Sequence, residues 1–382
     1  MATTAMKLVI ALVAIVITWK PARFVVSRLF SRLFLNVLQR TKGSSSCKPD
    51  GYVSDLFVHP VKSLRAVSLQ TASLDEKGLV GDRRFMVVYP LPIPAWKKEE
   101  GFGPTESTHR FLTQRQCPSL ATIVAKLETS TTTNGLLLER GNQSIRIDLS
   151  NSSNSNKETT TTYRAGIWGD QVLVTDMGDE AAAFLQAIVN ADKNCRVGDE
   201  GESEDGAASS SSSKTFLYQK VRLVCQSAKD DRRAPFEFAP SVAQTLGGKG
   251  PPVSLTDGFP VLMACQTSLD ELNEKLIQQG KDAIPMSRFR PNIVIEGTSK
   301  AFEEDNWKVV AIGEEGKNQQ LFCVVKACPR CKQSCTDQQT GAVSSEPVTT
   351  MKSFRALGAG DANGDVYFAY VKLFVVWRRT SW

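Results

Sequence analysis

Residues 53–64, VSDLFVHPVKSL, open a part of the chain in which short β-forming runs are bounded by glycine, proline or polar turns. Similar runs follow at 66–74 (AVSLQTASL), 85–90 (FMVVYP), 121–127 (ATIVAKL), 135–141 (GLLLERG) and 144–149 (SIRIDL). Runs of this length and composition are typical of strands. The sequence therefore predicts a mixed α/β fold that is rich in strands.

The second half of the chain mixes helices with strands. A helix is predicted at 179–189, with the apolar residues Ala183, Phe184, Ala187 and Ile188 on one face, and a second at 267–279, where leucines recur at helical spacing and Gly280 ends the pattern. Strands are expected at 292–295 and 321–325. Neither a G-x-G-x-x-G motif after a strand nor a G-x-x-x-x-G-K-S/T motif is present, so nucleotide binding by those motifs is not indicated.

The composition is that of a globular protein with one or two domains. Of the 382 residues, 41% are hydrophobic and 23% are charged. Residues 1–40 hold six basic and no acidic residues, and removing these six from the 46 basic residues leaves 40, which balance the 40 acidic ones. The net charge of +6 therefore belongs to the N-terminal segment, and binding to nucleic acid is not indicated.

The N-terminal segment has the features of a membrane anchor. Residues 8–19, LVIALVAIVITW, are apolar and uncharged, although a spanning helix needs ~20 residues. After Pro21, residues 24–38 interleave apolar residues with Arg28 and Arg32, as in a basic amphipathic helix. We expect residues 1–40 to anchor the protein with its main body on the cytosolic side. A cleaved secretory signal is the alternative.

Three stretches have linker-like or low-complexity composition. Residues 41–51 form a predicted linker, 151–162 a Ser/Asn/Thr tract, and 198–214 an acidic, Gly/Ser-rich tract. The last two are predicted to be disordered insertions, because they contain too few apolar residues to pack.

The cysteines suggest metal or sulfur chemistry. Nine cysteines in a long chain do not fit a short, evenly paired disulfide scaffold, and only two histidines exist, so a three-histidine zinc site is excluded. Cysteines 323, 328, 331 and 335 contain the Cys-x4-Cys-x2-Cys spacing of plant-type ferredoxins and would also suit zinc. Alternation along 321–325 instead favours Cys323 as a core residue.

Cys328 and Cys331 follow that strand in a turn flanked by Lys326, Arg330 and Lys332. Nearby cations favour the thiolate, which is the form that binds soft metals. A structural pair of buried cysteines is the alternative on spacing alone.

Two further groups of polar residues lie at predicted strand ends. One is Arg288-Phe-Arg290-Pro-Asn292, and the other is His59-Pro-Val-Lys62-Ser63 together with Gly81-Asp82-Arg83-Arg84. Either group alone is typical of charged residues exposed to solvent at the end of a strand. Together they supply the cationic and hydroxyl donors that an anionic pterin phosphate requires.

The order and spacing of these segments resemble the MOSC-domain family, and within it the mitochondrial amidoxime-reducing components. The resemblance covers residues 52–355 and runs through HPVKS, GDRRFMVV, FLTQRQCPSL, LTDGFPVLMACQTSLDELN, RFRPNIVIEG, FEEDNWKVVAIG, ACPRCKQSCTDQQTG and EPVTTMKSFR. It implies a MOSC-associated N-terminal β-barrel domain at 52–178. A MOSC β-barrel with flanking helices would follow at 179–382, ending in a divergent tail from about residue 356.

The resemblance also implies a molybdenum cofactor between the two barrels. Cys331 matches the catalytic molybdenum ligand, Cys328 supports it, and the pterin and phosphate would be held by Lys62, Ser63, Arg83, Asp257, Arg290 and Asn292. Two positions depart from the family: Pro329 stands where serine is common, and Gly258 stands where some relatives have threonine. In the tail, residues 366–377 are too apolar to be left in water, so we expect them to form a strand that closes or covers the barrel.

The activity implied is the reduction of N-hydroxylated compounds such as amidoximes and hydroxylamines. Because the chain has no flavin or nicotinamide motif, electrons would come from cytochrome b5 and NADH-cytochrome b5 reductase, on a cytosol-facing membrane that we expect to be the mitochondrial outer membrane. Two alternatives remain open, namely a sulfur carrier or sulfurtransferase acting through a persulfide on Cys331, and a non-enzymatic molybdopterin-binding module. Pyridoxal phosphate is a further ligand that the resemblance leaves open.

Overall fold

The computed structural model describes residues 51–91, 108–129, 134–150, 161–195, 218, 220–234, 250–314, 319–356, 366–370 and 372–376. The anchor predicted at 1–40, the linker except Gly51, the insertion at 198–214 and most of the insertion at 151–162 lie outside these residues. No helix within the described ranges is long and apolar enough to cross a membrane. The described residues within Gly51–Ala234 and Pro251–Trp382 belong to one compact unit.

Five strands close into a barrel, which confirms the β-rich class and the expected N-terminal barrel. Their order is β10 (Thr162–Ile167), β11 (Asp170–Asp176), β12 (Arg222–Gln226), β5 (Phe85–Pro90) and β6 (His109–Phe111). One buried cluster draws on all five strands and consists of Met86, Val88, Phe111, Ala165, Ile167, Val172, Val174 and Val224, with Leu255 added from outside. Because side chains alternate between the faces of a strand, this cluster fills the barrel.

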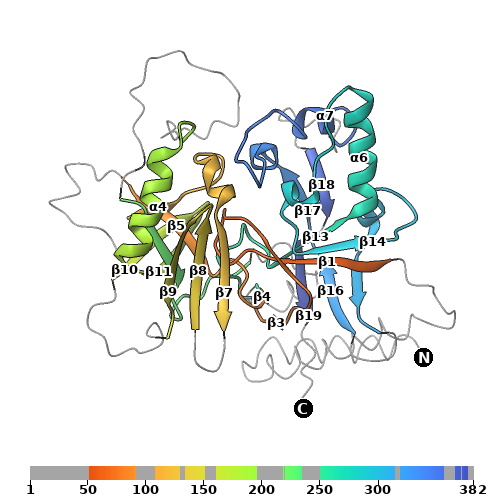
Figure 1. Cartoon of the computed structure of the whole chain (residues 1–382). Helices are drawn as coiled ribbons and strands as arrows, with labels where there is room; N and C mark the ends of the chain where they lie inside the picture. The colour runs from red at the N-terminus through yellow and green to blue at the C-terminus, as the bar shows by residue number, and fades with distance from the viewer. Residues whose placement is uncertain are drawn as a thin grey trace, which may run out of the picture. The chain divides into compact units, whose positions relative to one another are not determined.

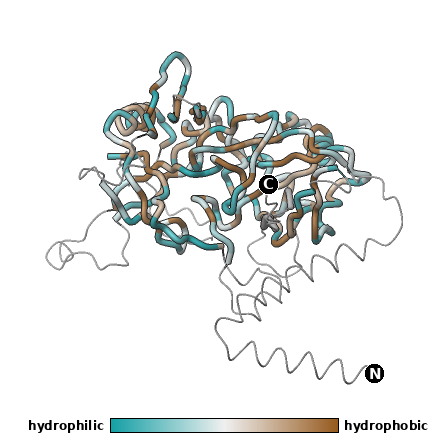
Figure 2. Tube along the Cα trace, turned by 90° about the horizontal axis from the view of Figure 1, so that it is seen from below, coloured by the Kyte–Doolittle hydropathy of each residue, from teal (hydrophilic) through white to brown (hydrophobic). Residues whose placement is uncertain are grey.

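Strand β5 is buried on both faces. Met86 and Val88 join the barrel cluster, whereas Phe85, Val87 and Tyr89 join a second cluster. That second cluster includes residues of a three-stranded sheet formed by β7 (Val124–Thr129), β8 (Asn134–Arg140) and β9 (Gln143–Asp148). Burial on both sides explains why FMVVYP shows no alternation of polar residues. Figure 2 shows that apolar stretches of the chain alternate with polar ones.

Helix α4 (Asp179–Ala191) is confirmed, but its buried face differs from the predicted one. The buried residues are Ala181, Ala182, Leu185, Ile188 and Val189. Ala183 and Ala187 are exposed, and Phe184 is only half-buried. The stretch AAAFLQAIV carries apolar residues on nearly every side, so spacing alone does not select a face. Both α4 and β12 follow residue 178, yet α4 packs against the cluster beside β5 and β12 completes the first barrel. Figure 1 shows α4 beside β5 and β10.

The second half is built on a seven-stranded sheet. Its order is β15 (Val309–Ile312), β16 (Gln320–Val324), β19 (Lys372–Val376), β13 (Val261–Cys265), β14 (Ile293–Glu296), β1 (Tyr52–Val58) and β2 (Val67–Leu69). Helix α6 (Gln266–Gln278), predicted at 267–279, connects the parallel strands β13 and β14. Figure 1 shows β1 beside β14, although the two are far apart in the sequence. Strand β1, at the start of the first half of the chain, therefore pairs with β14 of the second half.

The expectation that Cys323 is a core residue is corrected. In β16 the core side chain is that of the neighbouring Phe322, which is 2% exposed and packs with Val261, Met263 and Ile293. Cys323 lies on the opposite face of the strand and is half-buried. The alternation correctly indicated which residues of the strand share a face. It could not tell which of the two faces lies against the core.

The tail forms two strands in two sheets, where one strand was expected. Strand β18 (Val366–Tyr370) pairs with β17 (Ala327–Arg330), and β19 joins the large sheet between β16 and β13. Around β18 lie α7 (Val348–Lys352) and the 3-10 helices η3 (Met286–Phe289) and η4 (Glu303–Asn306). The remaining short elements are β3 (Leu74–Asp75), β4 (Gly78–Leu79), η1 (Pro118–Thr122) and η5 (Lys332–Cys335).

Candidate functional site

The loop after β1 carries Lys62 and Ser63 into the interior. Its backbone is held against the start of β5: the Lys62 N–H donates to the Phe85 carbonyl, and the Arg83 N–H donates to the His59 carbonyl, each at 2.7 Å. Lys62 and Ser63 are only 5% and 3% exposed. Ser63 has a φ of 68°, in the left-handed region that side chains disfavour. Such a conformation persists only where its neighbours fix it.

Asp82 is the centre of a buried charge network. Its side chain is fully buried and forms an ion pair with Arg83. The same carboxylate accepts hydrogen bonds from the His59 backbone N–H at 2.8 Å and from the Asn292 amide at 3.0 Å. A buried carboxylate needs several such partners, and here they come from both halves of the chain.

The Asn292 amide uses all of its hydrogen-bonding capacity within the protein. Its Oδ1 accepts from Arg83 and from the Leu262 backbone N–H, both at 3.1 Å. Its Nδ2 donates to Asp82 and, at 3.2 Å, to the Phe57 carbonyl. Two acceptor and two donor positions are therefore occupied. Asn292 joins β1, β13 and the loop before β5 at one point.

Arg290 lies buried at the end of η3. It is 7% exposed, has a φ of 55°, and its Nη1 donates to the Gln338 Oε1 at 3.0 Å. Burial, with the nearby charge of Arg83, lowers the pKa of Arg290 from 12.5 to about 9. The positive charge of Arg83 beside the buried Arg290 guanidinium indicates a site prepared for an anion.

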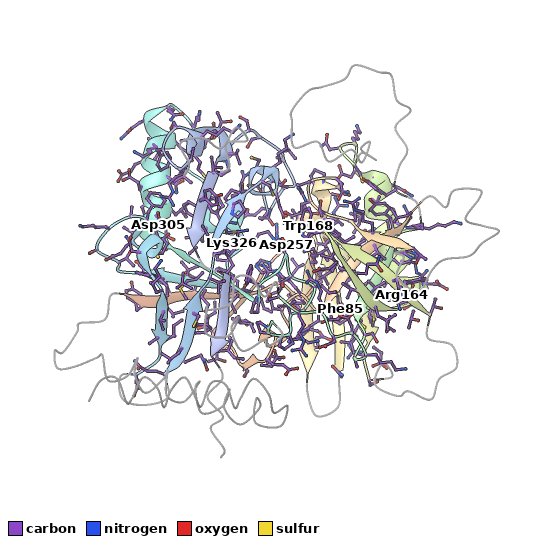
Figure 3. The ribbon with its side chains drawn as sticks, turned by 180° about the vertical axis from the view of Figure 1, so that it is seen from behind. Phe85, Arg164, Trp168, Asp257, Asp305 and Lys326 are labelled. Carbon is purple, nitrogen blue, oxygen red and sulfur yellow. The ribbon has the colours of Figure 1, made fainter. Side chains whose placement is uncertain are left out.

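Lys62 forms an ion pair with Asp257, which lies at the edge of the site. The Asp257 side chain is 53% exposed and also accepts a hydrogen bond from the Trp168 indole at 3.0 Å (Figure 3). Burial lowers the pKa of Lys62 from 10.5 to about 8, against the opposing effect of Asp257. The charges of Arg232 and Arg83 lower the pKa further.

Cys331 is exposed, at the point where β17 ends and η5 begins. Its carbonyl accepts hydrogen bonds from the N–H and hydroxyl of Ser334, at 3.1 and 3.0 Å. Cys328 is half-buried on β17, and Cys335 is buried, which raises the pKa of its thiol. Among the residues that the structure describes, no three His, Cys, Asp or Glu side chains are placed to hold a metal ion. The alternative four-cysteine cluster is therefore not formed there.

Arg330 connects the Cys331 segment to the Arg290 segment. Its Nη1 donates to the Phe289 carbonyl at 3.1 Å, and its Nε donates to the Phe368 carbonyl at 2.6 Å. The Arg330 guanidinium is thus directed at two backbone carbonyls. Because Phe289 directly precedes Arg290, these bonds fix the chain around Cys331 beside the buried arginine.

The two departures from the family pattern have local structural reasons. Gly258 has a φ of 136°, a value that residues with a side chain rarely adopt, so glycine suits this backbone. The reason is conformational and not steric, because no atom lies within 4 Å of a Cβ added at this position. Pro329 lies where the pairing of β17 with β18 is irregular. A proline cannot donate to a ladder and is tolerated at such irregularities.

Six of the seven predicted site residues are linked by direct contacts, by adjacency in the chain, or through two intermediate glutamines. Arg83 contacts Asn292 and the Arg290 carbonyl, and Lys62 contacts Asp257. A chain of hydrogen bonds through Gln114 and Gln338 joins the Ser63 carbonyl to Arg290. The seventh residue, Cys331, is connected through the backbone bonds of Arg330.

Sequence reasoning missed four residues of this site: Asp82, Gln114, Trp168 and Gln338. Asp82 stood in a quoted motif, and its place directly before two arginines and a buried strand was a usable signal. Trp168, in the turn between β10 and β11, is 41% exposed and has Arg115 over its ring at 4.7 Å. Its position depends on how the barrel closes, which no local pattern reveals.

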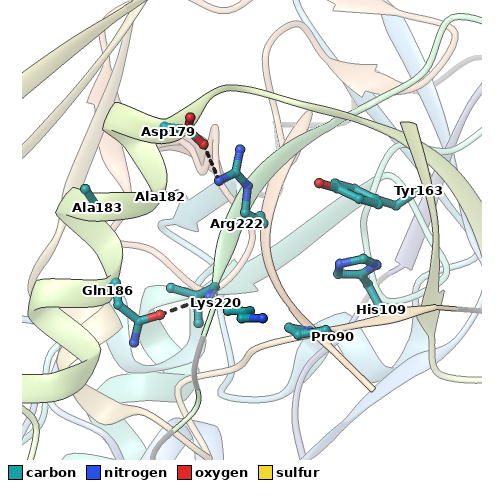
Figure 4. A pocket seen from close by; sticks show the side chains of 10 residues that line it. Pro90, His109, Tyr163, Asp179, Ala182, Ala183, Gln186, Lys220 and Arg222 are labelled. Atoms are coloured by element: carbon teal, nitrogen blue, oxygen red, sulfur yellow. Dashed lines mark hydrogen bonds and ion pairs between the residues drawn. The ribbon is translucent and has the colours of Figure 1, made fainter. Parts of the chain in front are cut away.

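A pocket of about 620 Å³ lies elsewhere, between the barrel and α4 (Figure 4). None of the predicted site residues lines it. Arg222, which lines it, is bonded to Asp176 at 2.6 Å and to Asp179 at 2.7 Å, so its charge is already neutralised. We therefore place the candidate site at the Asp82 network and not in this pocket.

The Asp82 network gives a stability prediction. Changing Asp82→Ala leaves the Arg83 guanidinium and the Asn292 amide without their buried acceptor, and removal of one partner of a buried pair costs about 3–5 kcal/mol. We expect a loss of this size in the free energy of unfolding by urea.

Asp75→Ala is the matched control, because Asp75 pairs with the neighbouring Arg84 but is 39% exposed. Its expected cost is about 0–1 kcal/mol. An equal loss in the free energy of unfolding in the two variants would show that the buried network stabilises the fold no more than an exposed ion pair does.

Comparison with known proteins agrees with this arrangement. Residues 50–192 match the MOSC N-terminal beta barrel domain, and residues 250–372 match the MOSC domain. The mitochondrial amidoxime reducing component 2 of Rattus norvegicus is 30% identical over 311 residues, which cover 80% of this chain and 72% of the rat protein. The Homo sapiens protein of that name is 28% identical over 311 residues with the same coverage.

A second group of relatives consists of larger proteins. The Homo sapiens molybdenum cofactor sulfurase is 25% identical over 297 residues, which cover 76% of this chain but only 27% of the sulfurase. The name of this second group refers to the molybdenum cofactor. With both domains matched in order and the rat protein covered over most of its length, the chain belongs to the MOSC-domain family, in the group that includes the mitochondrial amidoxime reducing components.

Proposed function

We propose that this protein is a molybdenum cofactor-dependent reductase of N-hydroxylated compounds such as amidoximes and hydroxylamines. The observation that carries the proposal is the exposed thiol of Cys331 on a segment that Arg330 bonds to the Phe289 carbonyl, directly before the buried Arg290. Lys62 and Arg83 add two further cations to the same site. Similarity to amidoxime reducing components over 80% of the chain supports the reaction class.

The residues present fit an anionic pterin cofactor. Lys62 and Arg290 have pKa values lowered first by burial and then by neighbouring cations, so an anion bound among them would be stabilised. Buried polar atoms without a hydrogen-bond partner lie close by in the chain: the Thr256 hydroxyl next to Asp257, and the His59 Nδ1 near the start of the loop that carries Lys62. Unpartnered buried groups of this kind are expected where a ligand completes the site.

We assign the residues different parts in holding the cofactor. The Cys331 thiolate would bind the metal, and Lys62, Ser63 and Arg83 would hold the phosphate and pterin with Arg290. Asp257 would set the position of the Lys62 ammonium at the solvent edge. When bound, the cofactor would supply the two-electron chemistry that removes the oxygen of an N-hydroxyl group. Asn292 differs from the expectation of direct binding, because its amide is fully used by the protein; we propose that it holds Arg83 and Asp82 in place.

Electron supply and location remain proposals. Cytochrome b5 and NADH-cytochrome b5 reductase are proposed as the electron donors, as the resemblance to the amidoxime-reducing components implies. The mitochondrial outer membrane is proposed from the names of the relatives together with the apolar, basic segment at 1–40.

The proposal is tested by metal and pterin analysis of the purified full chain, combined with an NADH-driven benzamidoxime assay containing both partners. We expect one molybdenum and one pterin per chain and benzamidine as product. Protein with molybdenum and pterin but no turnover would favour the non-enzymatic binding module instead.

A sulfurtransferase is the second candidate. It is supported by the exposed thiol of Cys331 and by the similarity to molybdenum cofactor sulfurases. The distinguishing measurement is the mass of the intact protein: a persulfide on Cys331 adds one sulfur atom, which cyanide removes. Persulfide without amidoxime reduction would replace the reductase proposal.

The lowered pKa of Lys62 predicts a pH dependence of cofactor retention. With a pKa of about 8, Lys62 is cationic below that pH and loses its proton above it. An anionic phosphate favours the cationic form, so binding would take up a proton above pH 8 and weaken as pH rises from 7 to 8.5. We expect the pterin to be released faster at pH 8.5 than at pH 7, as measured by its fluorescence in the released fraction.

The control is Lys62→Arg, whose side chain stays charged over this range. Its release rate should depend much less on pH. The same pH dependence in both proteins would show that another group is responsible.

A further inference from the structure

Two buried glutamines face each other next to the candidate site. Gln114, in the turn after β6, donates from Nε2 to the Oε1 of Gln338 at 3.0 Å, and Gln338 donates back to the Oε1 of Gln114 at 2.9 Å. They are 0% and 3% exposed. Neither residue is among those to which the family resemblance gives a role.

The pair extends to both sides of the site. Gln114 Nε2 also donates to the Ser63 carbonyl at 2.7 Å. Gln338 Oε1 accepts from Arg290 at 3.0 Å, and its Nε2 donates to the Thr336 carbonyl at 3.0 Å. The two amides thus join the loop after β1, the end of η3 and the segment that follows Cys331.

This bonding pattern fixes the orientation of both amides. All four amide hydrogens are used, and the Gln338 oxygen accepts two hydrogen bonds. Turning the Gln338 amide over would point its NH2 at the Arg290 guanidinium, which is itself only a donor. A buried network that is satisfied in one arrangement alone is rigid.

Ser63 and Arg290 both need such support. Their φ values of 68° and 55° lie in the left-handed region, so neither backbone is held by its own preference. Arg290 is also buried with a lowered pKa of about 9, and the Gln338 oxygen is a neutral acceptor that stabilises its guanidinium. Loss of the pair would release both residues at once.

We propose that Gln114 and Gln338 act as one positioning unit that sets the spacing of Ser63 and Arg290, and thereby determines how firmly the cofactor is retained. This inference rests on the proposed function, because it assumes that these two residues hold the cofactor. Gln114 and Gln338 are positioning residues and contact no substrate in this scheme.

The experiment compares Gln114→Met, Gln338→Met and the double variant in the full chain, produced in a host that makes the cofactor. Methionine keeps the length of the side chain and removes the hydrogen bonds. Molybdenum and pterin are measured per chain after gel filtration and during dialysis, and thermal unfolding is measured in parallel. We expect each single variant to lose the cofactor ~10-fold faster, as for other residues that orient metal-site ligands. The double variant should be no worse than the more severe single variant.

Two controls separate positioning from general destabilisation. Gln339→Met alters the exposed neighbour of Gln338 and should leave retention unchanged. Ile188→Ala creates a cavity under α4, away from the site, where Ile188 is 1% exposed. It should lower the melting temperature while leaving the rate of cofactor loss unchanged.

The outcomes distinguish the two proposals. Wild-type protein with molybdenum and pterin, together with glutamine variants that retain them equally well, overturns this inference alone. The inference also fails if Ile188→Ala loses cofactor as fast as the glutamine variants, or if the two single losses add in the double variant. A wild-type chain without molybdenum and pterin overturns the proposed function and this inference with it.

Discussion

Cys331→Ser is expected to abolish reductase activity while leaving the fold intact. Serine replaces a soft thiolate by a hard hydroxyl that barely ionises and is a poor molybdenum ligand. Cys331 is exposed, so the change removes no packing. Lys62, Arg83 and Arg290 remain in place, and we therefore expect the pterin content and the melting temperature to stay close to those of the wild type.

Cys328→Ser is the matched control, three residues away on the same segment. Its thiol is half-buried and donates to the Pro329 carbonyl at 3.8 Å, so we expect most of the activity to remain. Serine variants at 323 and 335 test the cluster that the sequence left open. If all four serine variants lost their metal equally, with iron or zinc in the wild type, the assignment of Cys331 to molybdenum would be wrong.

Ending the chain at Gly364 is expected to cause insolubility or unfolding. This change removes β19, which lies between β16 and β13 in the large sheet, and β18, which pairs with β17 next to Cys331. Loss of an interior strand leaves two unpaired strand edges, which are sites of aggregation. Soluble yield and thermal unfolding measure the effect.

A graded form of the same test is Phe368→Ala. Phe368 is fully buried and its ring stacks on Phe289, with 3.7 Å between the ring centroids. Removing a buried phenylalanine ring costs about 3–5 kcal/mol, which we expect as the loss in the free energy of unfolding. Val309→Ala, at a 38% exposed position on the strand β15, should change this free energy by no more than about 0.5 kcal/mol. For the chain that ends at Gly364, an unchanged melting temperature would show that the tail does not stabilise the fold.

Local features of the fold could be predicted from the sequence. Runs such as FMVVYP and SIRIDL specify strands because their β-branched and aromatic residues suit a pleated surface. Helix α6 was predicted within one residue at each end, because leucines at helical spacing precede Gly280, whose φ of 70° ends the helix. The order of the family motifs was enough to identify the two domains, which the comparisons confirm.

What periodicity could not supply is the choice of face and partner. In α4 and β16 the spacing was correctly recognised, yet the buried side differed, because a period is the same whichever face meets the core. The apolar tail likewise had to be covered, but its division between two sheets depends on which strands have a free edge.

The sequence by itself determined the elements, the family and the chemical types of the candidate site residues, because these depend on residue identity and on neighbours in the chain. Only the tertiary structure decided that Asp82 and Asn292 bind both halves together, and that Gln114 and Gln338 lie between Ser63 and Arg290. The members of that glutamine network lie on segments far apart in the sequence, and they meet because strand pairing closes the barrel and brings β1 into the second sheet. Hydrogen bonds across such distances depend on the whole packing, which no local pattern encodes.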